Sequence, residues 1–282
     1  MKELLGKPVS DRIGEEVREK AEAVSAMLGR RPKLAIVRCG ERRADLSYEK
    51  NACKKAEAFG LAASVTAFPE SVGDSQFLRL FSELNEDKTV DGILLLRPLP
   101  PQLNEGFAIS SMDAMKDVDG VSPVNAAGIY LGRDSFAPCT AEAVMELLKF
   151  YEISPEGKHV VIVGRSPVVG KPLAMLMLEQ NATVTVCHSR TKELWKVCQK
   201  ADILVSAAGR PRFITEQYIR RGTVVIDVGM NVDENGRLCG DVDFESCRKK
   251  AKAMTPVPGG VGAVTTAVLL KHVLLAANRD IL

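Results

Sequence analysis

Short apolar segments alternate with helical segments along most of the chain, and this alternation limits the possible folds more than any other feature. Seven segments are short, apolar and bounded by turn-forming residues, as buried strands are: 33–40, 63–68, 91–100, 158–164, 182–189, 201–209 and 223–229. Other segments have apolar residues every three or four positions, which is typical of helices: 10–28, 45–59, 74–85, 140–151 and 263–278. Strands that alternate with helices predict an α/β fold of open parallel sheets flanked by helices.

A loss of periodicity between Pro98 and Pro138, where Gly, Pro and Asp accumulate, divides the chain in two. We expect Thr140 to cap the next helix, which forms the hinge between two domains. The predicted first domain comprises 1–138 with a returning C-terminal helix at 263–282. The second, over 139–262, is predicted to be a Rossmann-like dinucleotide-binding domain.

Length and composition narrow the class of protein. A chain of 282 residues is one large domain or two ordinary ones. The net charge is +2, from 38 basic and 36 acidic residues, which gives no electrostatic reason to expect nucleic-acid binding. No apolar run approaches the roughly 20 residues of a membrane helix. The start, MKELLGKPVSDRIGEEV, lacks the apolar core of a signal peptide.

The cysteines and histidines argue against a metal site. Seven cysteines show no CxxC spacing, and the chain has only three histidines and no HExxH motif. Scattered free thiols of this kind are typical of a reducing compartment, so we expect a cytoplasmic protein.

One junction combines a buried strand, a glycine turn and a helix, in the sequence VVIVGRSPVVGKPLAMLML. Backbone amides at such a helix start bind phosphates, and Pro172 suits the first turn. Gly164 and Gly170 are six residues apart, so the spacing is not the common GxGxxG fingerprint. An ordinary tight turn between strand and helix is the alternative.

The end of the next strand predicts which cofactor is bound. NAD sites usually place Asp or Glu there to bind the ribose hydroxyls. This chain has Cys187-His188-Ser189-Arg190 instead, and Arg165 follows the neighbouring strand. Two guanidinium groups and a hydroxyl suit a ribose 2′-phosphate, so NADP is favoured over NAD. The alternative is that Arg190 only caps a solvated loop.

Several motifs resemble one enzyme family over essentially the whole chain. They are RPLP, KDVDGVSPVN and APCTAEAV in the first half, and GRSPVVGKP, ATVTVCHSRT, ADILVSAAG, VVIDVGMN, GDVDF and TPVPGGVGAVTTA in the second. In order, they resemble the methylenetetrahydrofolate dehydrogenase/cyclohydrolase family. The resemblance implies a homodimer with folate in a cleft between two domains. It also implies hydride transfer from 5,10-methylenetetrahydrofolate to NADP, followed in the usual member by hydrolysis to 10-formyltetrahydrofolate.

The resemblance also assigns site residues. Tyr48 matches a tyrosine that stacks on the substrate, and Asp119 matches the aspartate that hydrogen-bonds the pterin ring. Pro256, Gly259 and Gly260 match a loop that approaches the folate closely. The residues expected to bind the cofactor are Gly164, Arg165, Ser166, Gly170, Ser189, Arg190 and Met230.

Two positions depart from the family. Its catalytic lysine, four residues after the tyrosine, falls on Ala52, and the partner glutamine of its VQLPLP stretch falls on Leu96 of LLRPLP. A lysine with a lowered pKa can activate water, whereas hydride transfer needs only well-placed rings. We therefore expect an NADP-dependent dehydrogenase whose cyclohydrolase step is weak or lost.

Two other interpretations stay open. Lys55 or an ordered water can replace the missing pair and keep the enzyme bifunctional, although Lys55 also suits a solvated surface. Alternatively, the chain binds folate and NADP without turnover. Asp45 and His272, which also differ from the family's usual residues, have no assigned role at this point.

Overall fold

The computed structural model describes residues 1–279, which form two compact units. The six-stranded unit comprises Met1–Asp11 and Thr140–Thr265. The three-stranded unit comprises Arg12–Cys139 and the segment from Thr266 onward. The last residues of the predicted segment 263–282, which are 280–282, lie outside the described residues.

The three-stranded unit is built on a parallel sheet with the strand order β3-β2-β4. Its strands are β2 (Lys33–Cys39), β3 (Ala62–Phe68) and β4 (Gly92–Leu95). Its longer helices are α1 (Gly6–Leu28), which continues from the other unit, α2 (Arg43–Ala58), α3 (Asp74–Glu86) and α10 (Thr265–Arg279).

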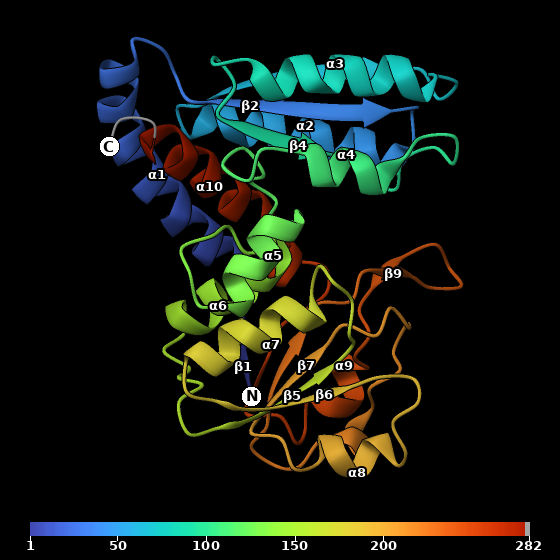
Figure 1. The fold of residues 1–282 in the computed structure, drawn as a ribbon. Helices are drawn as coiled ribbons and strands as arrows, with labels where there is room; N and C mark the ends of the chain where they lie inside the picture. Colours follow the sequence, from blue (N-terminus) through green and yellow to red (C-terminus); the bar gives the residue numbers. More distant parts are fainter. Residues whose placement is uncertain (280–282) are drawn as a thin grey trace. The chain divides into compact units, whose positions relative to one another are not determined.

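Helices α2 and α3 cover opposite faces of this sheet (Figure 1). The chain steps from β2 to β3 in one direction and from β3 past β2 to β4 in the other, so right-handed crossovers place the two helices on different sides. On the α3 face, Val37 and Cys39 pack against Phe77 and Phe81, whose rings stack 5.7 Å apart. All four side chains are buried, so this face is part of the core.

The segment expected to be irregular between Pro98 and Pro138 contains two short helices, α4 (Glu105–Ser111) and α5 (Pro123–Tyr130). Each has a side-chain cap: the Asn104 side chain accepts from Phe107 N, and the Ser122 side chain accepts from Asn125 N. Helices of seven and eight residues are too short for their periodicity to be recognised in the sequence.

The next helix, α6 (Cys139–Phe150), begins one residue before the expected start. Thr140 lies inside this helix, so the prediction that Thr140 is its N-cap is wrong.

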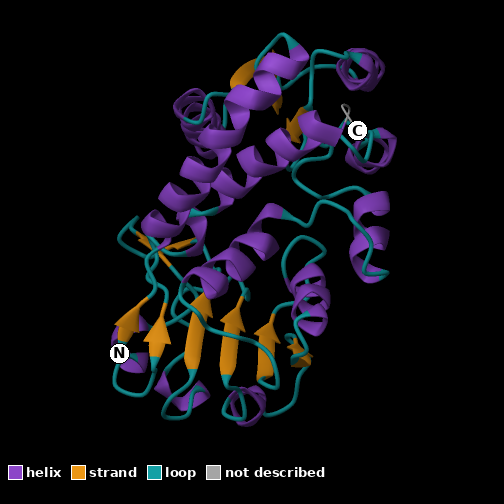
Figure 2. Cartoon of the chain, turned by 90° about the vertical axis from the view of Figure 1, so that its left-hand side faces the viewer, coloured by secondary structure: helices purple, strands orange, loops and turns teal. Residues whose placement is uncertain are grey.

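The six-stranded unit contains a parallel sheet with the order β1-β11-β8-β7-β5-β6. Figure 2 shows these strands side by side and pointing the same way. The four predicted strands are β5 (His159–Val163), β6 (Thr183–Cys187), β7 (Ile203–Ser206) and β8 (Val224–Asp227). The unit also has helices α7 (Gly170–Glu179), α8 (Leu194–Cys198) and α9 (Phe244–Cys247), two 3₁₀ turns, η1 (Glu216–Tyr218) and η2 (Val261–Ala263), and a hairpin of β9 (Asn231–Val232) and β10 (Leu238–Cys239).

Two short strands at one end of the sheet were not expected: β1 (Lys2–Glu3), at the edge, and β11 (Ala253–Met254), between β1 and β8. They pair in parallel, with Lys2 N donating to Lys252 O at 2.9 Å and Leu4 N donating to Met254 O at 2.8 Å. This pairing places the first eleven residues in the six-stranded unit, whereas the predicted boundary assigned all of 1–138 to the other domain.

One helical segment in the described part of the chain, Val261–Asn278, is long and apolar enough to span a membrane by composition alone. Within the protein, 67% of it is buried. Burial of this kind is also what the core helix of a globular domain shows.

Candidate functional site

The predicted cofactor and loop residues gather at one edge of the six-stranded sheet. Because its strands are parallel, the segments that follow β5, β6, β8 and β11 all leave from the carboxyl edge. The residues expected to bind the cofactor lie after β5, β6 and β8, and the 256–260 loop follows β11. Ligands of open α/β sheets bind outside this edge.

The glycine turn after β5 is packed backbone against backbone. A Cβ on Gly164 would lie 2.3 Å from Ala207 O, and one on Gly170 would lie 2.1 Å from Gly164 O. Ser166 closes the turn, because its Oγ accepts from Val169 N at 3.1 Å and its carbonyl accepts from the first turn of α7. The turn therefore needs both glycines, and it presents the start of α7 in a fixed position.

Two arginines stand beside each other at this edge. Val163 of β5 pairs with Cys187 of β6, so Arg165 and the Ser189–Arg190 turn follow neighbouring strands at the same level. All three side chains are exposed. His188 stabilises the Ser189–Arg190 turn, because its Nδ1 accepts a hydrogen bond from Arg190 N at 3.1 Å. The edge thus presents two positive charges and a hydroxyl.

The 256–260 loop is tied to the N-terminal segment, since Gly6 N donates to Gly259 O at 2.8 Å. Gly259 has a φ of +101°, which favours glycine. A Cβ on Gly260 would lie 2.5 Å from Pro256 O, so this glycine serves the packing of the loop itself. Pro256 is half-buried and Gly259 is exposed.

Two buried aspartates that sequence reasoning missed hold these loops together. Asp227 accepts from the backbone N–H groups of Gly229, Asp241 and Val242 at 2.9–3.0 Å. Asp241 accepts from the loop after β7: Ser206 Oγ and the N–H groups of Ala208, Gly209 and Arg210. Both acids lie in quoted motifs, VVIDVG and GDVDF, and an acid inside an apolar stretch was the available signal.

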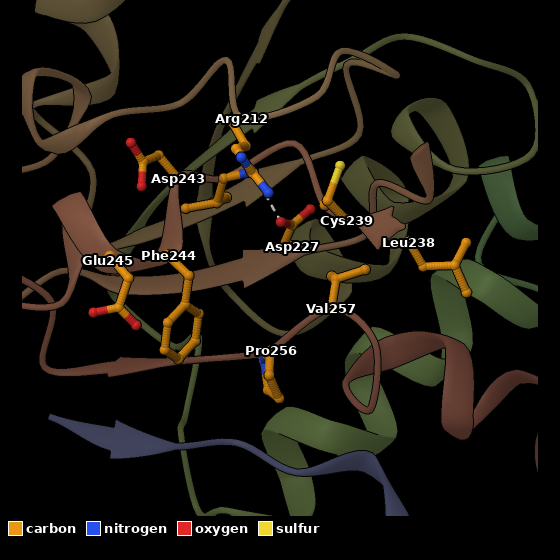
Figure 3. Close-up of a pocket in the computed structure, with 11 residues that line it drawn as sticks. Arg212, Asp227, Leu238, Cys239, Asp243, Phe244, Glu245, Pro256 and Val257 are labelled. Atoms are coloured by element: carbon orange, nitrogen blue, oxygen red, sulfur yellow. Dashed lines mark hydrogen bonds between the residues drawn. The ribbon is translucent and has the colours of Figure 1, made fainter. Parts of the chain in front are cut away.

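Asp227 also lines a pocket of about 560 Å³ together with Arg212, Phe244, Pro256 and Val257 (Figure 3). Burial raises the pKa of Asp227 to about 6, although its backbone donors oppose the rise. Because its oxygens are occupied by three N–H groups, Asp227 shapes the loops rather than offering a free carboxylate to the pocket.

In the three-stranded unit, the two acids of the KDVDG motif have separate roles. Asp117 is fully buried and accepts from Val121 N, Ser122 N and Asn125 Nδ2 at 2.7–3.0 Å. It therefore builds the turn that leads into α5. Asp119 has a side chain 28% exposed, and an Arg97 nitrogen lies 4.0 Å from its Oδ2. Burial raises the pKa of Asp119 to about 6, while Arg97 opposes the rise.

Tyr48 and Ala52 lie one turn apart on α2. Only three residues separate β2 from α2, so the first turns of α2 lie at the carboxyl edge of this sheet, the edge at which Leu96 follows β4. Tyr48 is half-buried. Ala52 is 0% exposed and Leu96 is 7% exposed, so both positions that are expected to depart from the family are buried and apolar. Lys55 is half-buried in the last turn of the same helix.

Two residues without a role in the sequence analysis receive one from the structure. Asp45, in the first turn of α2, pairs with Arg42 at 2.7 Å and suits the positive end of the helix dipole. His272 is 2% exposed, its Nδ1 donates to Val118 O at 2.8 Å, and its ring packs 4.9 Å from that of Phe136. It therefore fixes the turn that carries Asp119.

Comparisons with known proteins agree with this arrangement. Residues 4–119 match the family described as "Tetrahydrofolate dehydrogenase/cyclohydrolase, catalytic domain", and residues 138–281 match its "NAD(P)-binding domain". The "Bifunctional protein FolD" of Alkaliphilus oremlandii is 51% identical over 276 residues, covering 98% of this chain and 96% of the relative.

Two solved structures are also similar. The bifunctional FolD enzyme of Campylobacter jejuni has a TM-score of 0.96 at 40% identity, with 99% of each chain covered. The Trypanosoma brucei enzyme, complexed with NADP cofactor and inhibitor, has a TM-score of 0.92 at 37% identity, with 98% of this chain and 97% of that chain covered. This chain is thus an enzyme with a catalytic and an NAD(P)-binding domain, and it belongs to the tetrahydrofolate dehydrogenase/cyclohydrolase family.

Proposed function

We propose that the protein oxidises 5,10-methylenetetrahydrofolate to 5,10-methenyltetrahydrofolate with NADP, and that its cyclohydrolase step is weak or lost. One observation carries the proposal: the edge that suits the cofactor is complete, while the positions of the family's lysine and glutamine are the buried, apolar Ala52 and Leu96.

The residues at the sheet edge fit a phosphorylated dinucleotide. Gly164 and Gly170 lie where the turn leaves no room for a Cβ, Ser166 closes this turn, and its backbone amides suit a pyrophosphate. The exposed guanidinium groups of Arg165 and Arg190 suit a ribose 2′-phosphate. NADP, when bound, supplies the nicotinamide carbon that accepts the hydride. Ser189 and Met230, both exposed at this edge, are proposed to contact the cofactor.

The substrate contacts are proposed for the residues that the family resemblance assigns. Tyr48 offers a half-buried ring for stacking, and Asp119 offers a carboxylate that accepts from the N–H groups of a pterin. The 256–260 loop, with Pro256, Gly259 and Gly260, contributes backbone that can approach the folate. These residues hold the substrate, and a ring nitrogen of the substrate drives hydride departure, so the step needs no protein base.

The hydrolytic step is different, because water must be activated to attack the methenyl cation. A general acid or base typically contributes about 10²–10⁴-fold to such a step. Ala52 and Leu96 carry no group that can move a proton. The methenyl product is therefore expected to leave the enzyme and to be hydrolysed spontaneously or by another enzyme.

The first experiment mixes the protein with 5,10-methylenetetrahydrofolate and NADP or NAD, and follows NADPH (or NADH) and the methenyl product by their separate absorbances. We expect NADPH to form, faster than NADH, with methenyl product accumulating. Disappearance of that product faster than in enzyme-free buffer would overturn the loss of cyclohydrolase. Absence of turnover with both nucleotides would favour a binding protein without chemistry.

A second experiment restores the missing pair. The double variant Ala52→Lys with Leu96→Gln is expected to hydrolyse the methenyl product at least about 10²-fold faster than the wild type. Ala52→Met with Leu96→Gln is the matched control, because it adds similar bulk without the amine. Equal hydrolysis by all three proteins, with dehydrogenase activity retained, would contradict the role assigned to these two positions.

The names of the relatives support a second candidate, an enzyme that keeps both activities. In this candidate the half-buried Lys55 replaces the missing lysine. Lys55→Ala should then abolish hydrolysis and spare NADPH formation, whereas Lys54→Ala, which changes an exposed lysine of the same helix, should change neither. Hydrolysis that Lys55→Ala leaves unchanged would eliminate this candidate.

The family resemblance also leads us to propose a cytoplasmic homodimer. Light scattering coupled to gel filtration is expected to give about twice the 30.6 kDa of one chain. A mass of one chain at micromolar concentration would contradict the dimer.

A further inference from the structure

Arg97 occupies an unusual place between two carboxylates. Its side chain is 24% exposed, with one nitrogen 3.8 Å from Glu105 Oε1 and another 4.0 Å from Asp119 Oδ2.

Glu105 restricts where the guanidinium can lie. It stands in the first turn of α4, and its second oxygen, Oε2, accepts from Leu99 N at 2.8 Å. The glutamate is thus fixed to the same loop that carries Arg97. A guanidinium held on one side by Glu105 keeps its other nitrogen toward Asp119, which limits the loss of rotamer freedom on pairing.

The other groups that face Asp119 do not offer a permanent positive charge. Asp117, in the same turn, carries a negative charge and opposes ionisation of Asp119. Cys139, at the start of α6, contributes a thiol, and His272 of α10 already donates its Nδ1 proton to Val118 O. Among the groups that influence Asp119 in the described part of the chain, Arg97 is the one that carries a permanent positive charge.

We propose that Arg97 is a positioning residue for the substrate: it keeps Asp119 ionised and oriented so that the carboxylate accepts hydrogen bonds from the pterin at neutral pH. The inference has two parts. The contact between Asp119 and folate rests on the proposed function, whereas the control of Asp119 by Arg97 does not depend on the substrate.

The direction of the effect follows from charge. Burial already raises the pKa of Asp119 to about 6, close to physiological pH. An opposite charge within about 4–6 Å lowers a carboxyl pKa by roughly 1–3 units. Because Asp119 is partly exposed, we expect the low end of this range, and removal of Arg97 should raise the pKa to near 7. A protonated Asp119 presents a donor where the pterin also has donors, so folate binding weakens.

The first test uses the protein without substrate. Carbon-13 NMR of carboxyl-labelled aspartate gives the titration midpoint of Asp119, whose signal is assigned by its absence in Asp119→Asn. Arg97→Leu is expected to raise the midpoint by about one pH unit, while Arg97→Lys keeps it within a few tenths. Arg79→Leu, which removes an exposed charge from α3, is the matched control and should not move it. An unchanged midpoint in Arg97→Leu would overturn the proposal.

The second test measures kcat and KM for methylenetetrahydrofolate from pH 5.5 to 9. In Arg97→Leu, KM should rise severalfold near pH 6.5 and return toward the wild-type value at pH 8.5, with KM for NADP unchanged. A KM that rises equally at every pH would show a purely structural effect and overturn the link to folate. If the wild type shows no turnover, the proposed function fails, and the NMR midpoint still decides whether Arg97 controls Asp119.

Discussion

Single residues of the site differ in how well the sequence predicts them. The proposed substitutions at Ala52 and Leu96 come from counting along the sequence, because they concern residue type alone, and they stay a prediction. The roles of Asp227 and Asp241 could not be predicted, since the N–H groups they bind come from segments distant in the chain. The contact between Arg97 and Asp119 could not be predicted either, because it depends on how two separate loops pack together.

The glycine turn after β5 gives a prediction at the residue scale. Gly170→Ala places a methyl group 2.1 Å from Gly164 O, a backbone atom that cannot yield without moving the turn. We expect NADP affinity to fall at least tenfold and the melting temperature to drop by several degrees. Gly262→Ala, where nothing lies within 4 Å of the added atom, is the control for stability. Binding is measured by calorimetry, and equal affinity in Gly170→Ala and wild type would contradict the role of the turn.

Strands of four or more residues and helices of ten or more were predicted within a few positions, and a continuous apolar sequence is typical of parallel strands buried on both faces. The expected strand 91–100 is shorter, ending at Leu95, since Pro98 and Pro100 cannot donate to a ladder. β1 and β11 have two residues each, too few for any period, and β1 joins the sheet through β11, which also pairs with β8. The helices α4 and α5 were missed for the same reason of length.

One element junction makes a testable contribution to stability. Asp91, at the start of β4, is 4% exposed; its carboxylate accepts from both terminal nitrogens of Arg30 at 2.7 and 2.9 Å and from Lys33 N at 2.7 Å. Asp91→Ala removes these three hydrogen bonds and the buried ion pair with Arg30, and should lower the unfolding free energy by about 2–3 kcal/mol. Urea unfolding followed by circular dichroism measures it. Glu86→Ala, at an exposed acid ending α3, should stay within about 0.5 kcal/mol, and similar losses in both variants would refute the assignment.

At the scale of the whole molecule, the alternation of strands and helices was sufficient to predict two α/β units. The sequence analysis expected the C-terminal segment to return to the first domain, but it did not predict that Met1–Asp11 joins the stretch that starts at Thr140. That assignment depends on edge pairing, which no local pattern contains. The homodimer stays a prediction, because the structure contains a single chain.

The N-terminal segment can be tested through the tryptophan. The sequence contains one, Trp195, which lies in the six-stranded unit and reports on its unfolding by fluorescence. Leu4 is 0% exposed, so Leu4→Ala should destabilise this unit by about 2–4 kcal/mol. Leu5 is 43% exposed, and Leu5→Ala should cost less than about 1 kcal/mol. If the fluorescence transition of Leu4→Ala coincides with that of the wild type, the first residues do not support this sheet.

The pairing of β1 with β11 also bears on how the protein is made. Lys2 leaves the ribosome long before its partner Ala253. At about 5–20 residues per second, the interval is roughly 10–50 seconds. The three-stranded unit also depends on residues that are synthesised late, because it includes the segment from Thr266 onward. The six-stranded unit cannot close before Ala253 is made, nor the three-stranded unit before the segment from Thr266, so a chain released earlier than these residues contains no finished unit.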